Sequence, residues 1–368
     1  MKKIIWVTSE CFTETDYNYK LFEQLCKIYI IDWYVVFGQR PYLPKCFFSV
    51  FRNINNLNVH ICDKKYRDRD FRTIPFYIQL FRMVYSSKSD IIYFNYAPNP
   101  FFGIFANFYS NKQTIYCAHD GMAQNDSSKW GMVRKFSYDI LYKHARYVNM
   151  FSIAQSELMK KSYPNVKIHT MVLPLKDFGH SEQKRPKNLV RFLCFGNIIY
   201  QKNIELLIEA ANLLYEKGYR NFRVSINGSC SNWDYYKSFI KYEEIFELAP
   251  FFVPNSNLLT LFATSHYAVF PYRRVSQSGV LKIAFNYNLP VIVSNIGSFK
   301  EEVVNDVNGY FFKNGDVDSL VSVMENAIVR NREEYQNLLC RMKKYTDSKY
   351  SLASIVSYYS EMFENFVQ

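Results

Sequence analysis

The stretch that decides the fold runs from Phe270 to Ser294 and reads FPYRRVSQSGVLKIAFNYNLPVIVS. An apolar run that suits a buried strand ends at Pro271, and a short basic loop follows it. The segment 279–287 then has apolar residues at helical spacing, and Pro290 opens a second run rich in β-branched residues. A strand, a helix and another strand in this order are typical of a parallel sheet whose crossovers are helices.

The same alternation extends in both directions. It is interrupted at 180–188 by the polar sequence HSEQKRPKN, whose charges and proline are typical of a linker. Two alternating runs separated by a linker predict two doubly wound α/β domains. Ligands of such sheets bind at the carboxyl ends of the strands, so we expect the site in the cleft between the domains. Strands are expected at 4–8, 30–37, 90–94, 114–118, 147–153, 190–195, 222–226, 267–271, 290–294 and 309–312, with helices between them and at the end of the chain.

The composition bounds the class of protein. At roughly 150 residues per domain, 368 residues favour two domains. Lysine and arginine exceed aspartate and glutamate by 45 − 33 = 12, which suits a phosphate-bearing ligand, a nucleic acid or an anionic membrane. The eight cysteines form no C-x-x-C pair, so we expect buried thiols in a reducing compartment. The first apolar run ends at Thr8, too early for a signal peptide, and no run approaches a membrane span, so a cytoplasmic protein is expected.

The turn before the helix at 279–287 predicts a phosphate site at Ser276–Gly279. Backbone N–H groups at a helix N-terminus carry a partial positive charge and bind phosphate oxygens. Gly279 allows a ligand to approach closely, and Arg273 and Arg274 supply cations that pair with phosphate. The alternative is a serine-rich helix cap with both arginines in solvent.

A second stretch, at 195–211, reads FGNIIYQKNIELLIEAA and has the same arrangement. A strand ends at Gly196, a short loop carries Lys202, and a helix begins. Lys202 is therefore expected at the carboxyl end of a strand, where ligands of such a sheet bind. The alternative is an ordinary solvated lysine in a loop.

Together these stretches resemble the glycosyltransferases of the GT-B fold, specifically the large family 4 of retaining enzymes that use nucleotide sugars. Gly196, Lys202 and the run ELLIEA at 205–210 match the start of the second domain in that family. The turn SQSGVL at 276–281 is similar to the variant in members that make bacterial surface polysaccharides. The resemblance is thin in the first half, where it rests on IYCAHD at 115–120. Other similar elements are Ile226–Gly228, Phe270–Arg273, Ser294–Glu301, Asn308–Phe312 and Lys349–Leu352.

The resemblance implies a fold and a reaction. The fold has two Rossmann-like domains, an acceptor domain at 1–180 and a nucleotide-sugar domain at 189–349, joined by the linker 181–188. A C-terminal helix at 350–368 crosses back to the first domain. The implied reaction is a retaining transfer from a nucleotide diphosphate sugar, with UDP-sugar favoured and GDP-sugar as the alternative. The implied acceptor is a glycan or lipid-linked glycan of a bacterial capsule, O-antigen or exopolysaccharide.

The resemblance also implies roles for single residues. Lys202 would neutralise the departing diphosphate, His119 would orient the donor sugar, and Asp120 is an alternative base. For His119 the alternative is an ordinary strand-end histidine that is satisfied by its surroundings. Glu301 would contact donor hydroxyls, or it would instead balance the charge of a helix start. The donor and its phosphates would be bound by Gly196, Asn197, Lys202, Arg273, Ser276, Gln277, Ser278, Gly279 and Glu301.

Three departures from the family pattern concern the donor. The usual pair of glutamates with seven residues between them is absent, because Ser276 and Ala284 fill that spacing. The arginine expected after Gly196 is Asn197, and the usual Gly-Gly loop after the first strand is missing. The donor ribose must therefore be held in another way. An inactive relative that binds a sugar nucleotide is an alternative function.

Metal ions and other partners complete the expectations. The formal Asp-x-Asp pair, Asp68 and Asp70, lies in a charged loop and is expected at the surface, so no metal cofactor is expected. Lys160 and Lys161, with the basic run 184–187, would face anionic lipid if the acceptor is lipid-linked, giving peripheral membrane contact. A nucleic-acid-binding protein is the remaining alternative, but the basic residues are scattered and no motif for it is present.

Overall fold

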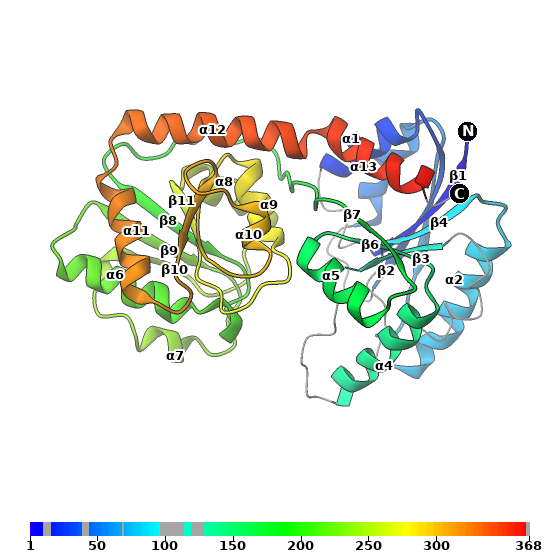
Figure 1. The fold of residues 1–368 in the computed structure, drawn as a ribbon, viewed down its shortest axis with the longest axis horizontal. Helices are drawn as coiled ribbons and strands as arrows, with labels where there is room; N and C mark the ends of the chain where they lie inside the picture. The colour runs from blue at the N-terminus through cyan, green and yellow to red at the C-terminus, as the bar shows by residue number, and fades with distance from the viewer. Residues whose placement is uncertain (10–15, 39–43, 68–69, 96–113, 119–128, 366–368) are drawn as a thin grey trace. The chain divides into compact units, whose positions relative to one another are not determined.

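The computed structural model of the chain describes residues 1–9, 16–38, 44–67, 70–95, 114–118 and 129–365. The chain divides into two compact units, whose elements are labelled in Figure 1. Unit 1 comprises Met1–Val172 together with Leu352–Gln368, and unit 2 comprises Leu173–Ser351. Each unit is built around its own parallel sheet.

The sheet of unit 1 has the strand order β3-β2-β1-β4-β5-β6-β7, and its pairings are parallel. Its central strands are apolar runs because both of their faces are buried: Ile4 and Val7 of β1 have no exposed surface. Asp32, the acidic residue within β2, is satisfied by Lys3 and Asn58, each 2.8 Å away. The elements are β1 (Lys3–Ser9), α1 (Asp16–Leu25), β2 (Ile30–Phe37), η2 (Lys45–Asn53), β3 (Leu57–Asp63), η3 (Phe71–Thr73), α2 (Ile74–Ser86), β4 (Ile91–Asn95), β5 (Thr114–Ala118), α4 (Lys129–His144), β6 (Tyr147–Met150), α5 (Ile153–Ser162), β7 (Lys167–Thr170) and α13 (Leu352–Asn365).

The C-terminal helix α13 packs on the sheet of unit 1, as the resemblance implies. Its Tyr359 lies against Trp6 of β1, with ring centroids 5.0 Å apart, and its Phe363 lies 5.9 Å from Tyr93 of β4. Aromatic pairs at these distances add to the large apolar area that the rings bury. The last helix is therefore part of the core of unit 1, although it follows unit 2 in the chain.

The sheet of unit 2 has the strand order β10-β9-β8-β11-β12-β13, again with parallel pairings. Helices α6 and α11 pack together beside it, with Leu207, Leu214 and Met324 fully buried (Figure 1). The chain order reverses between the neighbouring strands β8 and β11, and in open α/β sheets ligands bind at the carboxyl ends of such a strand pair. The elements are β8 (Val190–Phe195), η4 (Tyr200–Lys202), α6 (Ile204–Glu216), β9 (Phe222–Asn227), α7 (Trp233–Lys237), η5 (Glu243–Ile245), β10 (Phe246–Ala249), α8 (Asn255–Thr264), β11 (Tyr267–Phe270), α9 (Gly279–Asn286), β12 (Val291–Ser294), α10 (Phe299–Glu302), β13 (Gly309–Phe312), α11 (Val317–Val329) and α12 (Arg332–Tyr350).

The expected fold of two Rossmann-like α/β units is confirmed. The polar segment 181–188 differs from a free linker, because it is fastened to unit 2. Arg185 donates hydrogen bonds to the carbonyls of Ser265 at 2.7 Å and Asn288 at 3.0 Å. The division between the units falls earlier, after Val172. Within the described ranges, no helix is long and apolar enough to cross a membrane.

Candidate donor site at the carboxyl edge of the second sheet

The loops that follow β8, β9 and β11 meet at the point where the chain order reverses. Gly228 has φ +141°, and a Cβ there would lie 2.1 Å from the carbonyl oxygen of Gly196, so only glycine fits. Gly196 has φ +116°, and a Cβ on it would lie 3.5 Å from Cγ2 of Val280 in α9. These glycines therefore bring the loop after β8 against the first turn of α9.

Lys202 lies at the end of η4, and Asn203 follows with φ +54° at the start of α6. The ammonium nitrogen of Lys202 lies 3.6 Å from the ring centroid of Tyr272, in a cation–π contact. Tyr272 is the second residue after β11. Burial lowers the pKa of Lys202 to about 8, and the nearby Cys194 thiol acts in the opposite direction. Among the residues that the structure describes, no carboxylate forms an ion pair with Lys202. Its positive charge is therefore available to an anion.

Arg273 binds the segment that carries Lys202. Its guanidinium donates hydrogen bonds to the Tyr200 carbonyl and, at 2.8 Å, to Oε1 of Glu205. Its backbone N–H donates to the Gln201 carbonyl at 2.9 Å. The side chain of Glu205 is only 9% exposed, so removal of the arginine would leave a largely buried carboxylate unpaired. The structure thus gives Arg273 a positioning role and balances its charge with a carboxylate.

The predicted phosphate turn leads directly into α9. The Ser278 hydroxyl accepts a hydrogen bond from the Leu281 N–H at 3.3 Å and so caps the helix. Nε2 of Gln277 and the hydroxyl of Tyr272 are buried and make no hydrogen bond of normal geometry with the described residues. A buried polar group without a partner costs about 1–3 kcal/mol, so this turn has hydrogen-bonding capacity that the described protein leaves unused.

The sequence analysis names Tyr272 only as part of the Phe270–Arg273 turn and gives it no role at the site. It is 2% exposed, and burial raises its pKa well above the usual value, while the neighbouring Ser278 hydroxyl opposes that rise. The signals in the sequence are its place directly after Pro271, at the end of a strand, and the similarity of Phe270–Arg273 to a turn of the family. Its contact with Lys202 joins loops that are far apart in the chain, and spacing cannot reveal such a contact.

The other predicted residues have different surroundings. Asn197 and Arg274 are exposed, whereas Ser276 is half-buried. Glu301 lies within α10, where it acts electrostatically on the buried Lys282. His119, Asp120 and Asp68 lie outside the described residues. Asp70 caps a turn and pairs with Arg72 at 2.7 Å, and the described part of the chain has no group of three residues suited to a metal.

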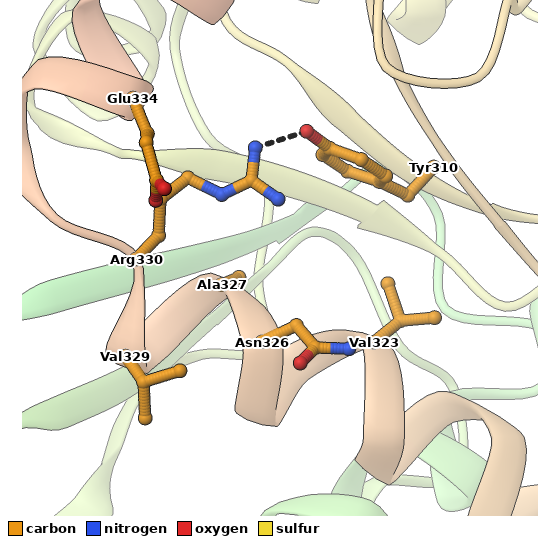
Figure 2. A pocket seen from close by; sticks show the side chains of 7 residues that line it. All are labelled: Tyr310, Val323, Asn326, Ala327, Val329, Arg330 and Glu334. Atoms are coloured by element: carbon orange, nitrogen blue, oxygen red, sulfur yellow. Dashed lines mark hydrogen bonds between the residues drawn. The ribbon is translucent and has the colours of Figure 1, made fainter.

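A pocket of about 300 Å³ lies elsewhere in unit 2, between β13 and the end of α11 (Figure 2). Arg330 at its centre bonds the Tyr310 hydroxyl, and an adjoining pocket of about 320 Å³ reaches Asp306 and Arg341. Asp306 precedes β13, so these pockets lie toward the amino edge of the sheet. None of the predicted donor-site residues lines them. The first pocket is lined by Tyr310, Val323, Asn326, Ala327, Val329, Arg330 and Glu334.

Known proteins are similar to this chain in the sequence of unit 2 and in fold. Residues 176–346 match the family model described as glycosyl transferases group 1, whereas no curated protein matches the chain in sequence. Among solved structures, the sucrose-phosphate synthase of Thermosynechococcus elongatus aligns over 99% of both chains, with TM-score 0.74 and 12% identity. HepE of Anabaena in complex with UDP and glucose aligns over 99% of this chain and 100% of that chain, with TM-score 0.70 and 13% identity. The lipopolysaccharide outer core galactosyltransferase WaaB aligns over 99% of both chains, with TM-score 0.62 and 11% identity.

The two Rossmann-like units have the GT-B fold. The family match over unit 2 and the fold of the whole chain together show that the protein is a glycosyltransferase. Its matched segment begins at residue 176 and ends in α12, so it includes every described residue of the candidate donor site.

Proposed function

We propose that the chain is a retaining, family 4-like glycosyltransferase that takes its sugar from a nucleotide diphosphate sugar. The observation that carries this proposal is the ammonium of Lys202, held 3.6 Å from the Tyr272 ring without a carboxylate partner in the described chain. When the bond between the anomeric carbon and the diphosphate oxygen breaks, negative charge develops on the leaving group. Lys202 and the N–H groups at the start of α9 stabilise that charge, so the phosphates need no metal ion.

The proposed transfer retains the configuration of the anomeric carbon. The acceptor hydroxyl attacks from the face that the diphosphate leaves, and a diphosphate oxygen takes the hydroxyl proton. This route requires no strong protein base. In this proposal His119 orients the donor sugar, Asp120 is the alternative base, and Glu301 contacts donor hydroxyls.

The proposed donor is a UDP-sugar, with a GDP-sugar as the alternative. The similarity to HepE, which was solved with UDP and with UDP-glucose, supports this choice. The proposed acceptor is a glycan or lipid-linked glycan of a bacterial surface polysaccharide. The similarity to WaaB, a lipopolysaccharide outer core enzyme, supports this class of acceptor.

A panel of nucleotide sugars tests the proposal. The purified chain is heated with UDP- and GDP-sugars, and its unfolding temperature is compared with that of the free protein. The matching donor should stabilise the fold, because a ligand that binds only the native state adds RT ln(1 + [L]/Kd) to its stability. Slow release of UDP or GDP from that donor should accompany the shift. Absence of stabilisation by every nucleotide would refute the donor assignment.

Peripheral contact with the cytoplasmic face of an anionic membrane is part of the proposal. Met132, Val133 and Phe136 of α4 are 60%, 43% and 63% exposed, and the exposed Lys135 lies among them. Three exposed apolar side chains beside a lysine suit contact with an anionic lipid interface. Phe136→Asp should reduce cosedimentation with phosphatidylglycerol vesicles, whereas the exposed Phe251→Asp in unit 2 should not. If the parent chain bound neutral vesicles as well as phosphatidylglycerol vesicles, an electrostatic contribution to membrane contact would be contradicted.

A second candidate is a sugar-nucleotide-binding relative without transfer activity. It is favoured by the missing glutamates: Ala284, which stands at the second position, is fully buried in α9 and bears no carboxylate. Tight donor binding without hydrolysis or transfer to any acceptor in a broad panel would favour this candidate.

A further inference from the structure

Lys176 lies beside the first residue of α9. A Cβ built on Gly279 would be 3.5 Å from both Cε and Nζ of Lys176, so the ammonium reaches the start of the helix. Its neighbours are tied to the other end of α9: Asp177 accepts a hydrogen bond from Asn286 at 3.1 Å, and the Phe178 N–H donates to the Tyr287 hydroxyl at 3.0 Å. The position of Lys176 is therefore set by an ordered segment of unit 2.

The charges at this place are unbalanced. The start of a helix carries a partial positive charge and favours acidic side chains, yet the first turn of α9 has none. Lys176 adds a full positive charge there, and in the described chain it has neither an ion pair nor a hydrogen bond. Two positive groups that face one another are stabilised when an anion lies between them.

An independent observation also indicates a ligand at this turn. The side chain of Tyr272 is 2% exposed, and its hydroxyl, which lies beside Ser278, makes no hydrogen bond of normal geometry with any residue that the structure describes. The ring of Tyr272 also makes the cation–π contact with the ammonium of Lys202. Lys202 and Lys176 therefore approach the Ser278–Gly279 turn from two different segments.

We infer that Lys176 is the second cation of the diphosphate site, in place of the arginine that Asn197 replaces. This inference rests on the proposed function. Arg273 already pairs with Glu205 and donates to the Tyr200 carbonyl, so its charge is balanced within the protein, whereas that of Lys176 is not balanced by any described residue. A nucleoside diphosphate carries charge on both phosphates, so two lysines and the start of α9 match it better than one lysine.

Calorimetric titration with UDP and with inorganic pyrophosphate tests the inference. Lys176→Ala should weaken binding of both by at least about tenfold, the loss expected for a charge-assisted contact. Lys176→Arg should retain most of the affinity. Lys184→Ala is the matched control, because it removes the same charge from an exposed position in the same segment. Equal thermal unfolding of all variants shows that each is folded.

A second readout reports the contact directly. Pyrophosphate should slow acetylation of Lys176 and Lys202 by a water-soluble acetylating reagent, as measured by mass spectrometry, and should leave Lys184 unaffected. Unchanged affinity in Lys176→Ala, with Lys202→Ala impaired, would overturn the role of Lys176 and leave the proposed function intact. A parent chain that binds neither UDP, GDP nor pyrophosphate would overturn both.

Discussion

The cations at the two edges of the sheet in unit 2 differ in whether a carboxylate lies beside them. At the amino edge, Arg330 and Arg341 lie 3.9 and 3.1 Å from Oδ1 of Asp306, so both cations lie beside a carboxylate. At the carboxyl edge, the ammonium of Lys202 lies on the Tyr272 ring, with no carboxylate against it among the described residues. The two pockets described above lie toward the amino edge, whereas Lys202, which has no carboxylate partner in the described part of the chain, lies at the carboxyl edge. Lys202 therefore differs from the two arginines of the amino edge in its lack of a described carboxylate partner, and this difference, rather than pocket volume, marks the candidate donor site.

The largest expected effect concerns the backbone at the two edges. Gly228, at the carboxyl edge, has φ +141° and no room for a Cβ, whereas Gly218, at the amino edge, has φ +97° and open space around it. Gly228→Ala should lower the free energy of unfolding by about 3 kcal/mol or more, since conformational strain and overpacking add. Gly218→Ala should cost only about 1–2 kcal/mol, from the backbone conformation alone. Urea unfolding measures both, and equal losses would contradict the tight contact between the loops.

The next effect separates the cations of the two edges. Lys202→Ala should weaken UDP binding by about 1.5–3 kcal/mol, because it removes a charge-assisted contact to the diphosphate. Arg341→Ala removes an equal charge from the amino edge and should leave UDP affinity unchanged. Isothermal titration calorimetry of both variants measures the difference. Comparable losses in the two would mean that net charge, rather than the site, governs binding.

The smallest effect is a pH dependence that only the carboxyl edge should have. Burial lowers the pKa of Lys202 to about 8, so the side chain is charged below that pH and loses its proton above it. UDP affinity should therefore fall several-fold between about pH 7 and pH 9.5, with the fall displaced upward because the bound anion favours the charged lysine. In Lys202→Arg the guanidinium stays charged over this range, so the fall should disappear. A fall that persists in Lys202→Arg would assign the titration to another group.

The sequence predicts the interior of each sheet better than its margins. The buried runs at 4–8 and 190–195 are continuous apolar strands because both faces of a central parallel strand are covered. The strands β3, β7 and β10, which the sequence analysis does not expect, all lie at sheet edges. Their exposed positions allow polar residues, as in the sequence KIHT of β7, so the apolar signal is lost.

The sequence likewise predicts some features of the candidate site and not others. Gly196, Lys202 and the Ser276–Gly279 turn can be predicted because each follows a recognisable strand, and strand ends meet at one edge of a parallel sheet. The partnership of Arg273 with Glu205 cannot, because an arginine in a basic loop has the same sequence pattern whether it binds a phosphate or a neighbouring carboxylate.

By itself the sequence determined the α/β class, the two-part organisation and the loops that carry the candidate donor site, because these depend on periodicity and on chain order along single strands and helices. Only the tertiary structure decided which cation is balanced by a carboxylate, which ring supports Lys202, and that Lys176 lies at the start of α9. Those outcomes depend on distances between segments that are far apart in the chain, and such distances are set by how the sheet and its loops pack.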